Sequence, residues 1–495
     1  MKKKFLLVLL LLAISLTFGA CRKAKVVEEP VITEAPVEVE KPVYVEEKNI
    51  VEPTPVIIEL PKEELKPVFI EPEPVIIESE PIKTLTKNDV AYWLEKYDDD
   101  ELNQILMTQD DIKLFNDLNI ENSIPLVDLK KEKTVLTKSE LTKLIKSVST
   151  PSKSQRYDEN GAIVDNNFYN KLNENLDLDS ISNSNEIQYA ICTNRTILRT
   201  YPTDAKITKE PFQFEFDRFA ETAVYAAEPL LVYKESKDKN WYFVRMYNYI
   251  GWINANDIAL TSRDNLFEYV EKAPFIVVNA DKIYLEGNEF SMGTRLPISK
   301  INYENEDKTV IIPVRKSDGT AEFKNVSVNS SLDVSLGYLS YNRKNILIQA
   351  FKLLDDPYGW GGLNGGRDCS AFIIDIYRTF GLDLPRNSYE QGKLSLGKQY
   401  PMPYDMNIES REELFRTLKP GTPLYILGHV MIYLGEDNGD FFIIHNYTGN
   451  YTRDNGNLEY NRVMSTTISP LSMRLFNGKT YLERIYTGKD FILNK

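Results

Sequence analysis

Apolar residues recur every three or four positions in the segment 83–185, and this spacing predicts a set of helices there. The first helix is expected over 90–97, and either Thr86 or Asn88 can cap its start. A later helix begins at Thr137-Lys-Ser-Glu140, whose spacing is that of a capping box. No residue pattern in this segment indicates catalysis.

Short runs in which apolar and polar residues alternate follow this helical segment. They predict β-strands separated by polar turns every 8–12 residues or so, as in a small β-barrel. The segment 186–262 has this pattern most clearly, and 263–336 repeats it, so we expect two small barrels. The predicted strands are 230–233, 241–246 and 250–253 in the first segment, and 275–278, 309–314 and 326–328 in the second.

The segment 337–495 combines both patterns, which predicts an α+β domain. Helical spacing covers 345–354 and then 372–380, and the Gly-rich run Tyr358-Gly-Trp-Gly-Gly362 separates the two helices. Two buried strands joined by a polar turn follow, at 429–434 and 441–445. The expected fold class is therefore α+β and multidomain, with a helical N-terminal segment, two small barrels and a C-terminal α+β domain.

The first 21 residues are typical of an export signal. Three lysines at 2–4 precede an apolar stretch at 5–16, which is too short to cross a membrane as a helix. Small residues then lead to Cys21, and this ending resembles a bacterial lipoprotein signal. The resemblance implies that Cys21 carries a lipid. An ordinary secretory signal that happens to contain a cysteine is the alternative.

Residues 22–82 are rich in proline and glutamate, so we expect a disordered, extended tether rather than a folded domain. Arg22 follows the cysteine. An Asp at this position would resemble the retention signal of inner-membrane lipoproteins in Gram-negative bacteria. These features predict an exported protein that is anchored by lipid to the cell envelope, on the periplasmic face of the outer membrane.

Composition removes several classes of function. A formal net charge of −14 argues against a nucleic-acid-binding face, which would need basic residues to neutralise phosphates. Three cysteines cannot form a disulfide framework. The chain has only two histidines, His429 and His445, so a histidine-rich metal site is excluded and we expect neither a metal nor an organic cofactor.

Cys369 is the candidate nucleophile because it lies at the predicted start of a helix. Free N–H groups and the helix dipole favour a thiolate there, which predicts a lowered pKa. A thiolate nucleophile needs an imidazole base and a group that orients it, and His429 and His445 lie on adjacent predicted strands. The alternative is that each histidine is simply packed in the core. Cys192 has none of these features and is interpreted as a buried structural thiol.

The segment 186–262 resembles a bacterial SH3 domain, in the variant that precedes certain cell-wall peptidases. Gly-Trp before a strand is common in that family, and the other motifs discriminate better. The matching runs are Arg199-Thr-Tyr-Pro-Thr203, Phe216-Asp-Arg218, Glu228-Pro-Leu230, Asn240-Trp-Tyr-Phe-Val244 and Tyr249-Ile-Gly-Trp-Ile253.

The C-terminal segment resembles the NlpC/P60 family of papain-like cysteine peptidases, which cut bacterial cell-wall peptides. Several blocks match in the right order, and Ala371 is a departure because the family usually has glycine there. The matching residues are Tyr358–Gly362, Asp368-Cys369-Ser370, Phe380–Ser388 with Gln391, Gly428-His429-Val430 and His445. By this resemblance Cys369 is the nucleophile, His429 the base and His445 the third member of a triad. The Cys369 backbone N–H and the Trp360 indole N–H are the expected donors to the oxyanion.

The resemblance also implies a substrate. Family members with this SH3 variant cut the bond between γ-D-glutamate and diaminopimelate (or L-lysine) in peptidoglycan stem peptides, often next to a free N-terminal L-alanine. Asp368 matches a position that pairs with the peptide ammonium group, and Ser370 and Ser388 match positions that bind the γ-glutamyl α-carboxylate. The first barrel is expected to contribute Tyr249 and, as a second acidic partner for the amine, Glu228.

Two other functions stay open at this point. The protein could be a murein-binding lipoprotein without catalysis, although its retention of all three triad residues weighs against this. It could also be an amidase or acyltransferase that uses the same fold. The expected partners are stem peptides and, through the lipid anchor, a membrane; the expected state is a monomer that binds no nucleic acid.

Overall fold

The computed structural model describes residues 84–123, 125–302, 307–454 and 456–493, all within one compact unit that begins at Glu80. The predicted export signal, with Cys21, and the predicted tether at 22–82 lie outside the described residues. Within the described ranges, none of the helices combines the length and the apolar character needed to cross a bilayer.

The helical segment differs in detail from the sequence prediction. Thr137 and Glu140 form the predicted capping box at α5. At α2, however, the N-cap residue is Asp89 rather than Thr86 or Asn88, because Thr86 donates its N–H and its hydroxyl to the Asp89 carboxylate. The first helix also ends at Leu94, short of the predicted end at residue 97. The helices are α2 (Val90–Leu94), α3 (Asp99–Asn103), α4 (Gln109–Asn122), α5 (Lys138–Val148) and α6 (Asn166–Leu176).

These helices divide between two hydrophobic cores. Buried residues of α2 and α4 join the core of the C-terminal domain, whereas those of α5 and α6 join the core shared by the two β-rich regions. An ionic cluster fastens the first helix to the C-terminal domain: Lys87 and Lys96 each place their Nζ 2.7 Å from the Asp437 carboxylate. The Tyr92 hydroxyl donates to the same group at 2.8 Å. These donors, the two lysines above all, hold the pKa of Asp437 far below its usual range.

The first β-rich region is a seven-stranded antiparallel sheet in the order β5-β4-β8-β7-β6-β3-β9. All three strands predicted here are confirmed, and Trp241 and Trp252 lie in the core. The Trp252 indole N–H donates to Ser149 Oγ at 3.0 Å, which ties the end of α5 to this sheet. The strands are β3 (Gln188–Cys192), β4 (Thr196–Arg199), β5 (Ala220–Val224), β6 (Pro229–Glu235), β7 (Trp241–Arg245), β8 (Ile250–Asn254) and β9 (Ile258–Thr261).

The second β-rich region is a five-stranded sheet in the order β15-β14-β13-β10-β16, accompanied by the hairpin β11–β12. Each of the three strands predicted here falls on an observed strand. Helix α7 (Arg263–Glu271) connects it to the first region. The strands are β10 (Phe275–Val278), β11 (Lys282–Leu285), β12 (Asn288–Ser291), β13 (Arg295–Ile301), β14 (Lys308–Arg315), β15 (Ala321–Val328) and β16 (Val334–Leu336).

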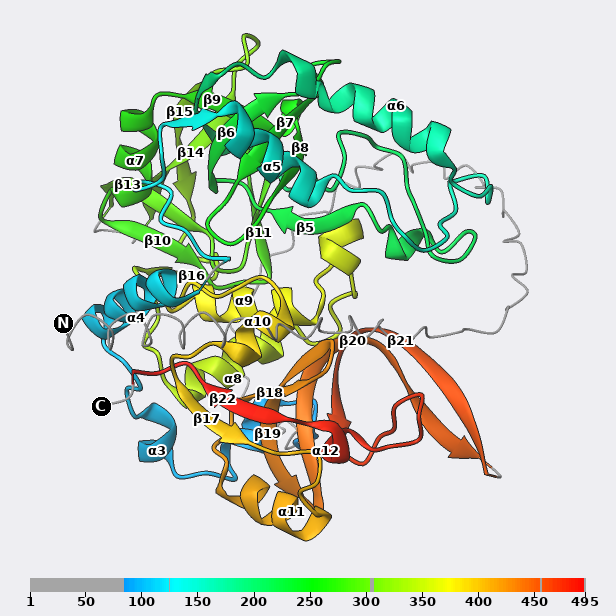
Figure 1. The fold of residues 1–495 in the computed structure, drawn as a ribbon. Coiled ribbons are helices and arrows are strands. Elements are labelled where there is room, and N and C mark those ends of the chain that lie inside the picture. Colours follow the sequence, from blue (N-terminus) through cyan, green and yellow to red (C-terminus); the bar gives the residue numbers. More distant parts are fainter. Residues whose placement is uncertain (1–83, 124, 303–306, 455, 494–495) are drawn as a thin grey trace, which may run out of the picture. The chain divides into compact units, whose positions relative to one another are not determined.

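The C-terminal domain packs helices α8 (Arg343–Lys352) and α9 (Cys369–Arg378) against a six-stranded sheet in the order β17-β22-β18-β19-β20-β21 (Figure 1). Both helices were predicted, and Phe372, Ile376 and Phe380 lie in the core as their spacing indicated. The remaining elements are β17 (Lys398–Pro401), β18 (Pro423–Ile426), β19 (His429–Asp437), β20 (Asp440–Asp454), β21 (Asn457–Pro470), β22 (Thr487–Asp490), α10 (Ser388–Lys393), α11 (Ile408–Thr417) and α12 (Tyr481–Arg484).

The first β-rich region meets the C-terminal domain through the short helix η4 (Trp360–Gly365), which packs against β5. Gly362 has a φ of +87°, and a Cβ there would lie 2.6 Å from the Cβ of Ala223, so only glycine allows this approach. Arg195 donates to the carbonyl oxygens of Gly362 and Gly366 at 2.7 and 3.0 Å. The first β-rich region therefore holds the loop that precedes Cys369.

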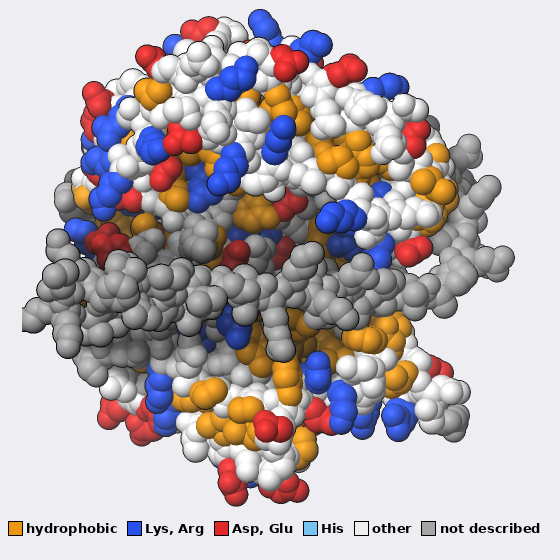
Figure 2. Space-filling view, viewed as in Figure 1, with side chains coloured by type: hydrophobic (Ala, Val, Ile, Leu, Met, Phe, Trp, Pro, Cys, Tyr) orange, Lys and Arg blue, Asp and Glu red, His pale blue; other side chains and the backbone are white. Residues whose placement is uncertain are grey.

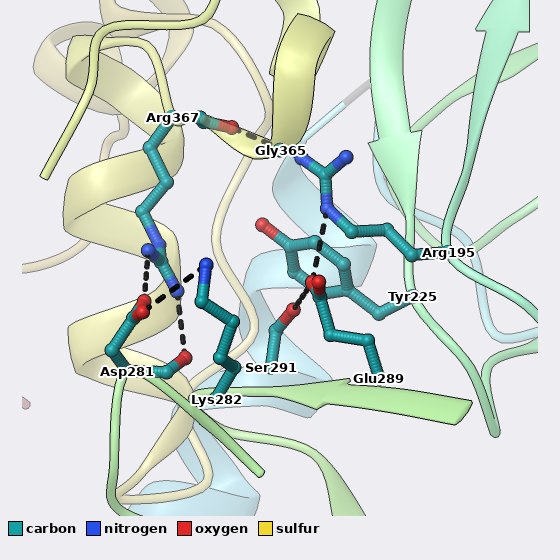
Figure 3. Close-up of a pocket in the computed structure, with 9 residues that line it drawn as sticks. Arg195, Tyr225, Asp281, Lys282, Glu289, Ser291, Gly365 and Arg367 are labelled. Atoms are coloured by element: carbon teal, nitrogen blue, oxygen red, sulfur yellow. Dashed lines mark hydrogen bonds and ion pairs between the residues drawn. The ribbon is translucent and has the colours of Figure 1, made fainter. Parts of the chain in front are cut away.

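The second β-rich region reaches the same loop through a polar cluster (Figure 3). Arg367 donates to Asp375 of α9 at 2.7 Å and to Asp281 at 2.5 Å. On the other side of this cluster Arg195 lies 3.5 Å from Glu289. Both β-rich regions thus contact the residues just before Cys369. On the face shown in Figure 2, acidic and basic side chains are intermixed, so neither sign of charge dominates there.

Candidate active site

Cys369 is the first residue of α9, as predicted, and its side chain is 9% exposed. The helix begins here because the Asp368 carboxylate caps it, accepting the Ala371 N–H at 2.9 Å. The same carboxylate accepts the Gly361 N–H at 3.2 Å, which joins the Gly-rich run to the helix start. Local sequence therefore places the thiol at a helix N-terminus, where it is nearly fully buried.

The pKa of Cys369 differs from the sequence prediction. Burial, and then the negative charge of Asp368, raise the pKa of the thiol to about 12. The N–H groups of Val430 and Ser370 lower it, as a helix start should, but they are outweighed. The predicted lowering of the pKa is thus wrong for the resting site. Desolvation destabilises the thiolate more than the N–H groups at the helix start stabilise it. Cys369 therefore rests as a thiol at neutral pH.

The two histidines form a hydrogen-bonded pair. His429 opens β19 and His445 lies on β20, the neighbouring antiparallel strand, as predicted. His429 Nε2 and His445 Nδ1 are 2.7 Å apart. His445 is fully buried, and its ring stacks on Tyr447 with 3.9 Å between the ring centroids. The Val430 N–H points at the Cys369 sulfur, so the residue next to His429 in the chain lies at the thiol.

Both imidazoles are neutral at neutral pH. Burial lowers the pKa of His429 to about 4, although the charge of Asp368 opposes the shift. Burial, and then the proximity of His429, lower the pKa of His445 well below its usual value. A neutral imidazole is the form that can accept a proton, so either histidine can serve as a base at neutral pH.

Asp368 and Ser370 are both held by Arg386, a residue to which the sequence analysis gave no role. Arg386 donates to the two Asp368 oxygens at 3.0 and 2.5 Å and to Ser370 Oγ at 2.7 Å. Its Nε also donates to Thr222 Oγ1 of β5. Burial would raise the pKa of Asp368, but Arg386 outweighs it and keeps the pKa below its usual value. The motif containing Arg386 was recognised, yet only the fold shows what the guanidinium binds.

Ser388 is the first residue of α10 and is half-buried. The N-cap of this helix is Asn387, so Ser388 is not the capping residue. Its hydroxyl makes no hydrogen bond to the residues that the structure describes, which leaves it able to bind a ligand.

Two glutamates of the first barrel lie near the C-terminal domain, and they differ in what they bind. Glu228 is buried and its carboxylate is 2.5 Å from Arg378 of α9. Glu221, on β5, instead accepts a hydrogen bond from the Tyr249 hydroxyl. Burial raises the pKa of Glu221, while the nearby charge of Arg386 lowers it. The acidic side chain that accompanies Tyr249 is thus Glu221, which the sequence analysis did not single out.

Two aromatic residues of the Gly-rich run lie at the site. The Trp360 ring stacks under the Arg218 guanidinium, 4.4 Å from the ring centroid, and meets the edge of Phe216. Tyr358 was quoted in the motif without a role. Burial above all, and then the charge of Cys369, raise its pKa, so its hydroxyl keeps its proton.

Across the described ranges, no group of three or more His, Cys, Asp or Glu side chains is arranged to hold a metal ion. Cys192 is buried at the end of β3, and its sulfur donates to the Asn194 carbonyl at 3.0 Å. Its interpretation as a buried thiol away from the histidines is therefore confirmed.

Two family models match the chain. Residues 207–254 match an SH3 domain of the SH3b1 type, and residues 355–467 match the NlpC/P60 family. The second match spans Cys369, His429 and His445. The chain therefore combines a β-rich, SH3-like region with a C-terminal NlpC/P60 fold.

Relatives of known name and structure agree with these matches. A γ-D-glutamyl-L-lysine dipeptidyl-peptidase of Bacillus cereus (strain ATCC 10987 / NRS 248) is 25% identical over 210 residues, 38% of this chain and 55% of the relative. A protein of the same name from Bacillus subtilis (strain 168) is 34% identical over 80 residues, 16% of this chain and 25% of the relative. The chain thus matches about half or less of each relative's length. A solved NlpC/P60 endopeptidase from Photobacterium damselae subsp. piscicida superposes with a TM-score of 0.65 at 20% identity, covering 81% of this chain and 97% of that one.

Proposed function

The chain carries an NlpC/P60 domain behind an SH3 domain, and on that premise we propose that it is a cysteine endopeptidase of peptidoglycan stem peptides. It hydrolyses the bond between γ-D-glutamate and the following diamino acid, diaminopimelate or L-lysine. The observation that carries the proposal is the position of Cys369 at the start of α9, beside a histidine pair only 2.7 Å apart. Two relatives named as γ-D-glutamyl-L-lysine dipeptidyl-peptidases support the choice of bond.

The reaction proceeds through an acyl-enzyme. The Cys369 sulfur attacks the γ-carbonyl carbon of D-glutamate while its proton moves to Nδ1 of His429. The tetrahedral intermediate expels the amine of the diamino acid, which takes that proton from His429, and leaves a thioester on Cys369. Water then attacks the thioester with His429 as the base, which releases the γ-glutamyl acid and restores the thiol.

The negative oxygen of the tetrahedral intermediate needs donors that are already in place. The Cys369 backbone N–H is one, because the first N–H groups of a helix have no partner within it. The Trp360 indole N–H is the second that we assign. The Tyr358 hydroxyl is a third, since its raised pKa keeps the proton on the oxygen beside the thiol.

Recognition of a free N-terminal L-alanine rests on the first barrel. We assign the ammonium group to Glu221 and Tyr249, with Asp368 as the acidic group from the catalytic domain. Glu228, the partner expected from the sequence, is paired with Arg378, whereas the Tyr249 hydroxyl donates to Glu221, so Glu228 is the poorer choice on the barrel side. The α-carboxylate of the γ-linked glutamate is assigned to the hydroxyls of Ser370 and Ser388, and the charge of Arg386 favours an anion at that point.

Mass spectrometry of L-Ala-γ-D-Glu-diaminopimelate and of its L-lysine counterpart tests the reaction. We expect release of L-Ala-γ-D-Glu by the wild-type protein and no release by Cys369→Ala. Acetylation of the peptide N-terminus should raise KM if the ammonium group is recognised. The matched pair Glu221→Gln and Glu228→Gln locates that recognition: Glu221→Gln should raise KM about tenfold, and Glu228→Gln should leave it within about twofold.

Other outcomes would redirect the proposal. If both peptides stay intact while purified murein is bound, the protein is a binding lipoprotein. If another amide or an acyl transfer is catalysed through Cys369, the same papain-like site performs a different reaction. A monomer is expected in light scattering.

We also propose export and lipid anchoring, on the strength of residues 1–21 and Cys21. Metabolic labelling with a radioactive fatty acid should mark the wild-type protein and leave Cys21→Ser unmarked. Fractionation of the cell envelope should then find the wild-type protein in the outer membrane.

A further inference from the structure

His445 has a second polar neighbour that the triad does not include. Its Nε2 lies 3.2 Å from Ser469 Oγ, on the opposite ring edge from the nitrogen that faces His429. Ser469 is on β21, and its Oγ in turn lies 3.2 Å from the hydroxyl of Thr467, the residue paired across the strands with His445. His445 is 0% exposed and Ser469 is 5% exposed, so water does not compete for these contacts.

The short contact between the histidines restricts where their protons can lie. With both rings neutral, one nitrogen of the 2.7 Å pair must carry a hydrogen and the other must not. If the hydrogen is on His429 Nε2, the Nδ1 of His429 has a free lone pair and can take the thiol proton. If the hydrogen is on His445 Nδ1, then His429 carries its own hydrogen on Nδ1 and cannot act as a base.

The arrangement in which His429 can accept a proton requires a hydrogen-bond acceptor beside Nε2 of His445. When Nδ1 of His445 accepts from His429, its ring hydrogen must be on Nε2, and this buried N–H needs an acceptor. Ser469 Oγ is the acceptor at hydrogen-bonding distance, and the Ser469 hydroxyl can donate its own hydrogen bond to the Thr467 hydroxyl. This requirement persists after the thiol proton has moved, because His429 is then charged and must still donate through Nε2.

We propose that Ser469 is a positioning residue that holds His445 with its proton on Nε2, so that His429 stays in the tautomer that can accept a proton at Nδ1. The inference rests on the proposed cysteine-peptidase function for its catalytic consequence, but its first test does not need any activity. The ring plane of His445 is fixed separately by stacking on Tyr447.

The test uses the fact that the chain has only two histidines. In the full chain labelled with 15N-histidine, nitrogen NMR at pH 7.5 separates protonated from unprotonated ring nitrogens, and His445→Gln identifies which signals belong to which ring. We expect both rings to carry hydrogen on Nε2. In Ser469→Ala, the His445 signals should move toward the Nδ1-protonated form, and Ser469→Thr, which keeps the hydroxyl, should restore the wild-type pattern.

Activity supplies the second readout. On the stem peptide, Ser469→Ala should lower kcat by about ten- to a hundredfold and leave KM within about twofold, because the substrate does not touch Ser469. Ser469→Thr should recover most of kcat. Ser465→Ala is the matched control: Ser465 lies on the same strand, opposite Tyr447, and makes no hydrogen bond to either histidine. It should keep wild-type kcat.

Two results would overturn the proposal. One is a wild-type spectrum in which His445 carries its hydrogen on Nδ1. The other is a Ser469→Ala protein whose melting temperature, tautomers and kcat all match the wild type. If the wild-type protein cuts no peptide but the tautomers respond to Ser469 as expected, the positioning role stands and the proposed function fails.

Discussion

The chain buries two thiols within its described residues, and the surroundings of the two differ in polarity. Cys192, in the first β-rich region, faces three carbonyl oxygens, of Asn194, Val224 and Asp257, which favour the S–H form, and one backbone hydrogen bond, from Asn194, lowers its pKa. Cys369 instead faces the N–H groups of Val430 and Ser370, which favour the thiolate. Burial raises the pKa of both thiols. A raised pKa therefore does not separate the two thiols, whereas the groups that lower it do: one backbone hydrogen bond at Cys192, and two together with the charge of Arg386 at Cys369.

The largest expected effect is on catalysis. Cys369→Ala should lower kcat for the stem peptide by at least about a thousandfold, because no other group can form the acyl-enzyme. Cys192→Ala should keep kcat within about twofold, because its sulfur touches neither histidine. Both rates are measured by mass spectrometry of the released dipeptide. Equal loss of activity in the two variants would contradict the division drawn between the thiols.

Alkylation compares the same two thiols without substrate. Iodoacetamide should modify Cys369 and leave Cys192, which is 0% exposed, unmodified in the folded protein. With a pKa of about 12, the rate at Cys369 should rise about tenfold per pH unit from pH 7 to pH 9, with no plateau.

The control for this experiment is His429→Ala, in which the slope should persist. A plateau near pH 6 in the wild type would mean that a thiolate–imidazolium pair already exists in the resting enzyme, and would overturn the neutral resting state.

A smaller effect concerns stability at acidic pH. It arises at the Cys369 site, because both histidines are buried in the same domain as Cys369. In the unfolded chain each imidazole binds a proton below a pKa of about 6.5, whereas the folded pKa of His429 is about 4. The unfolded state therefore binds more protons as pH falls, and this part of the stability is present above pH 6.5 and lost toward pH 4.

At pH 5.5 the loss amounts to about 1 kcal/mol for His429, with more from His445. Urea unfolding at pH 7.5 and 5.5 measures it, with the double variant His429→Gln/His445→Gln as the control. Asp356 and Asp383, whose pKa values are raised to about 6, change stability in the opposite direction and are the same in both proteins. An equal pH dependence in the two proteins would contradict the lowered imidazole pKa values.

The smallest expected effect is on packing. Cys192→Ala removes a sulfur from the core of the first barrel and should lower the free energy of unfolding by about 1 kcal/mol. Cys369→Ala should change it by less than about 0.5 kcal/mol, because it also removes a thiol hydrogen-bonding group from a dry site. Thermal unfolding of the two variants, measured at the same pH, checks the difference.

Local patterns in the sequence were sufficient for the positions of the candidate catalytic groups. Helical spacing after residue 369 placed Cys369 at a helix start, and an apolar run beginning at His429 placed that residue at the start of a strand. The two-residue turn at Asn438 and Gly439 made the strands neighbours. Each of these depends on contacts within a short stretch of chain, which sequence periodicity reflects.

Contacts between distant segments could not be predicted in this way. Glu221 and Glu228 are seven residues apart on the same barrel, and no local pattern tells which one meets Tyr249 and which meets Arg378. The pKa of Cys369 likewise depends on how completely other segments bury it. Ser469 needed the register of β20 and β21, which brings it within hydrogen-bonding distance of His445.

Strand β19 carries His429 at one end and Asp437 at the other, and this arrangement has a mechanical consequence. A pull on the chain from before residue 84 would reach the contact of Lys87 with Asp437 first, and then those of Tyr92 and Lys96 with the same carboxylate. The tension would then run along β19 in shear, shared by its hydrogen bonds to β18 and β20. The imidazole sits at the far end of that path, so the catalytic geometry is the last part of the strand to feel the load.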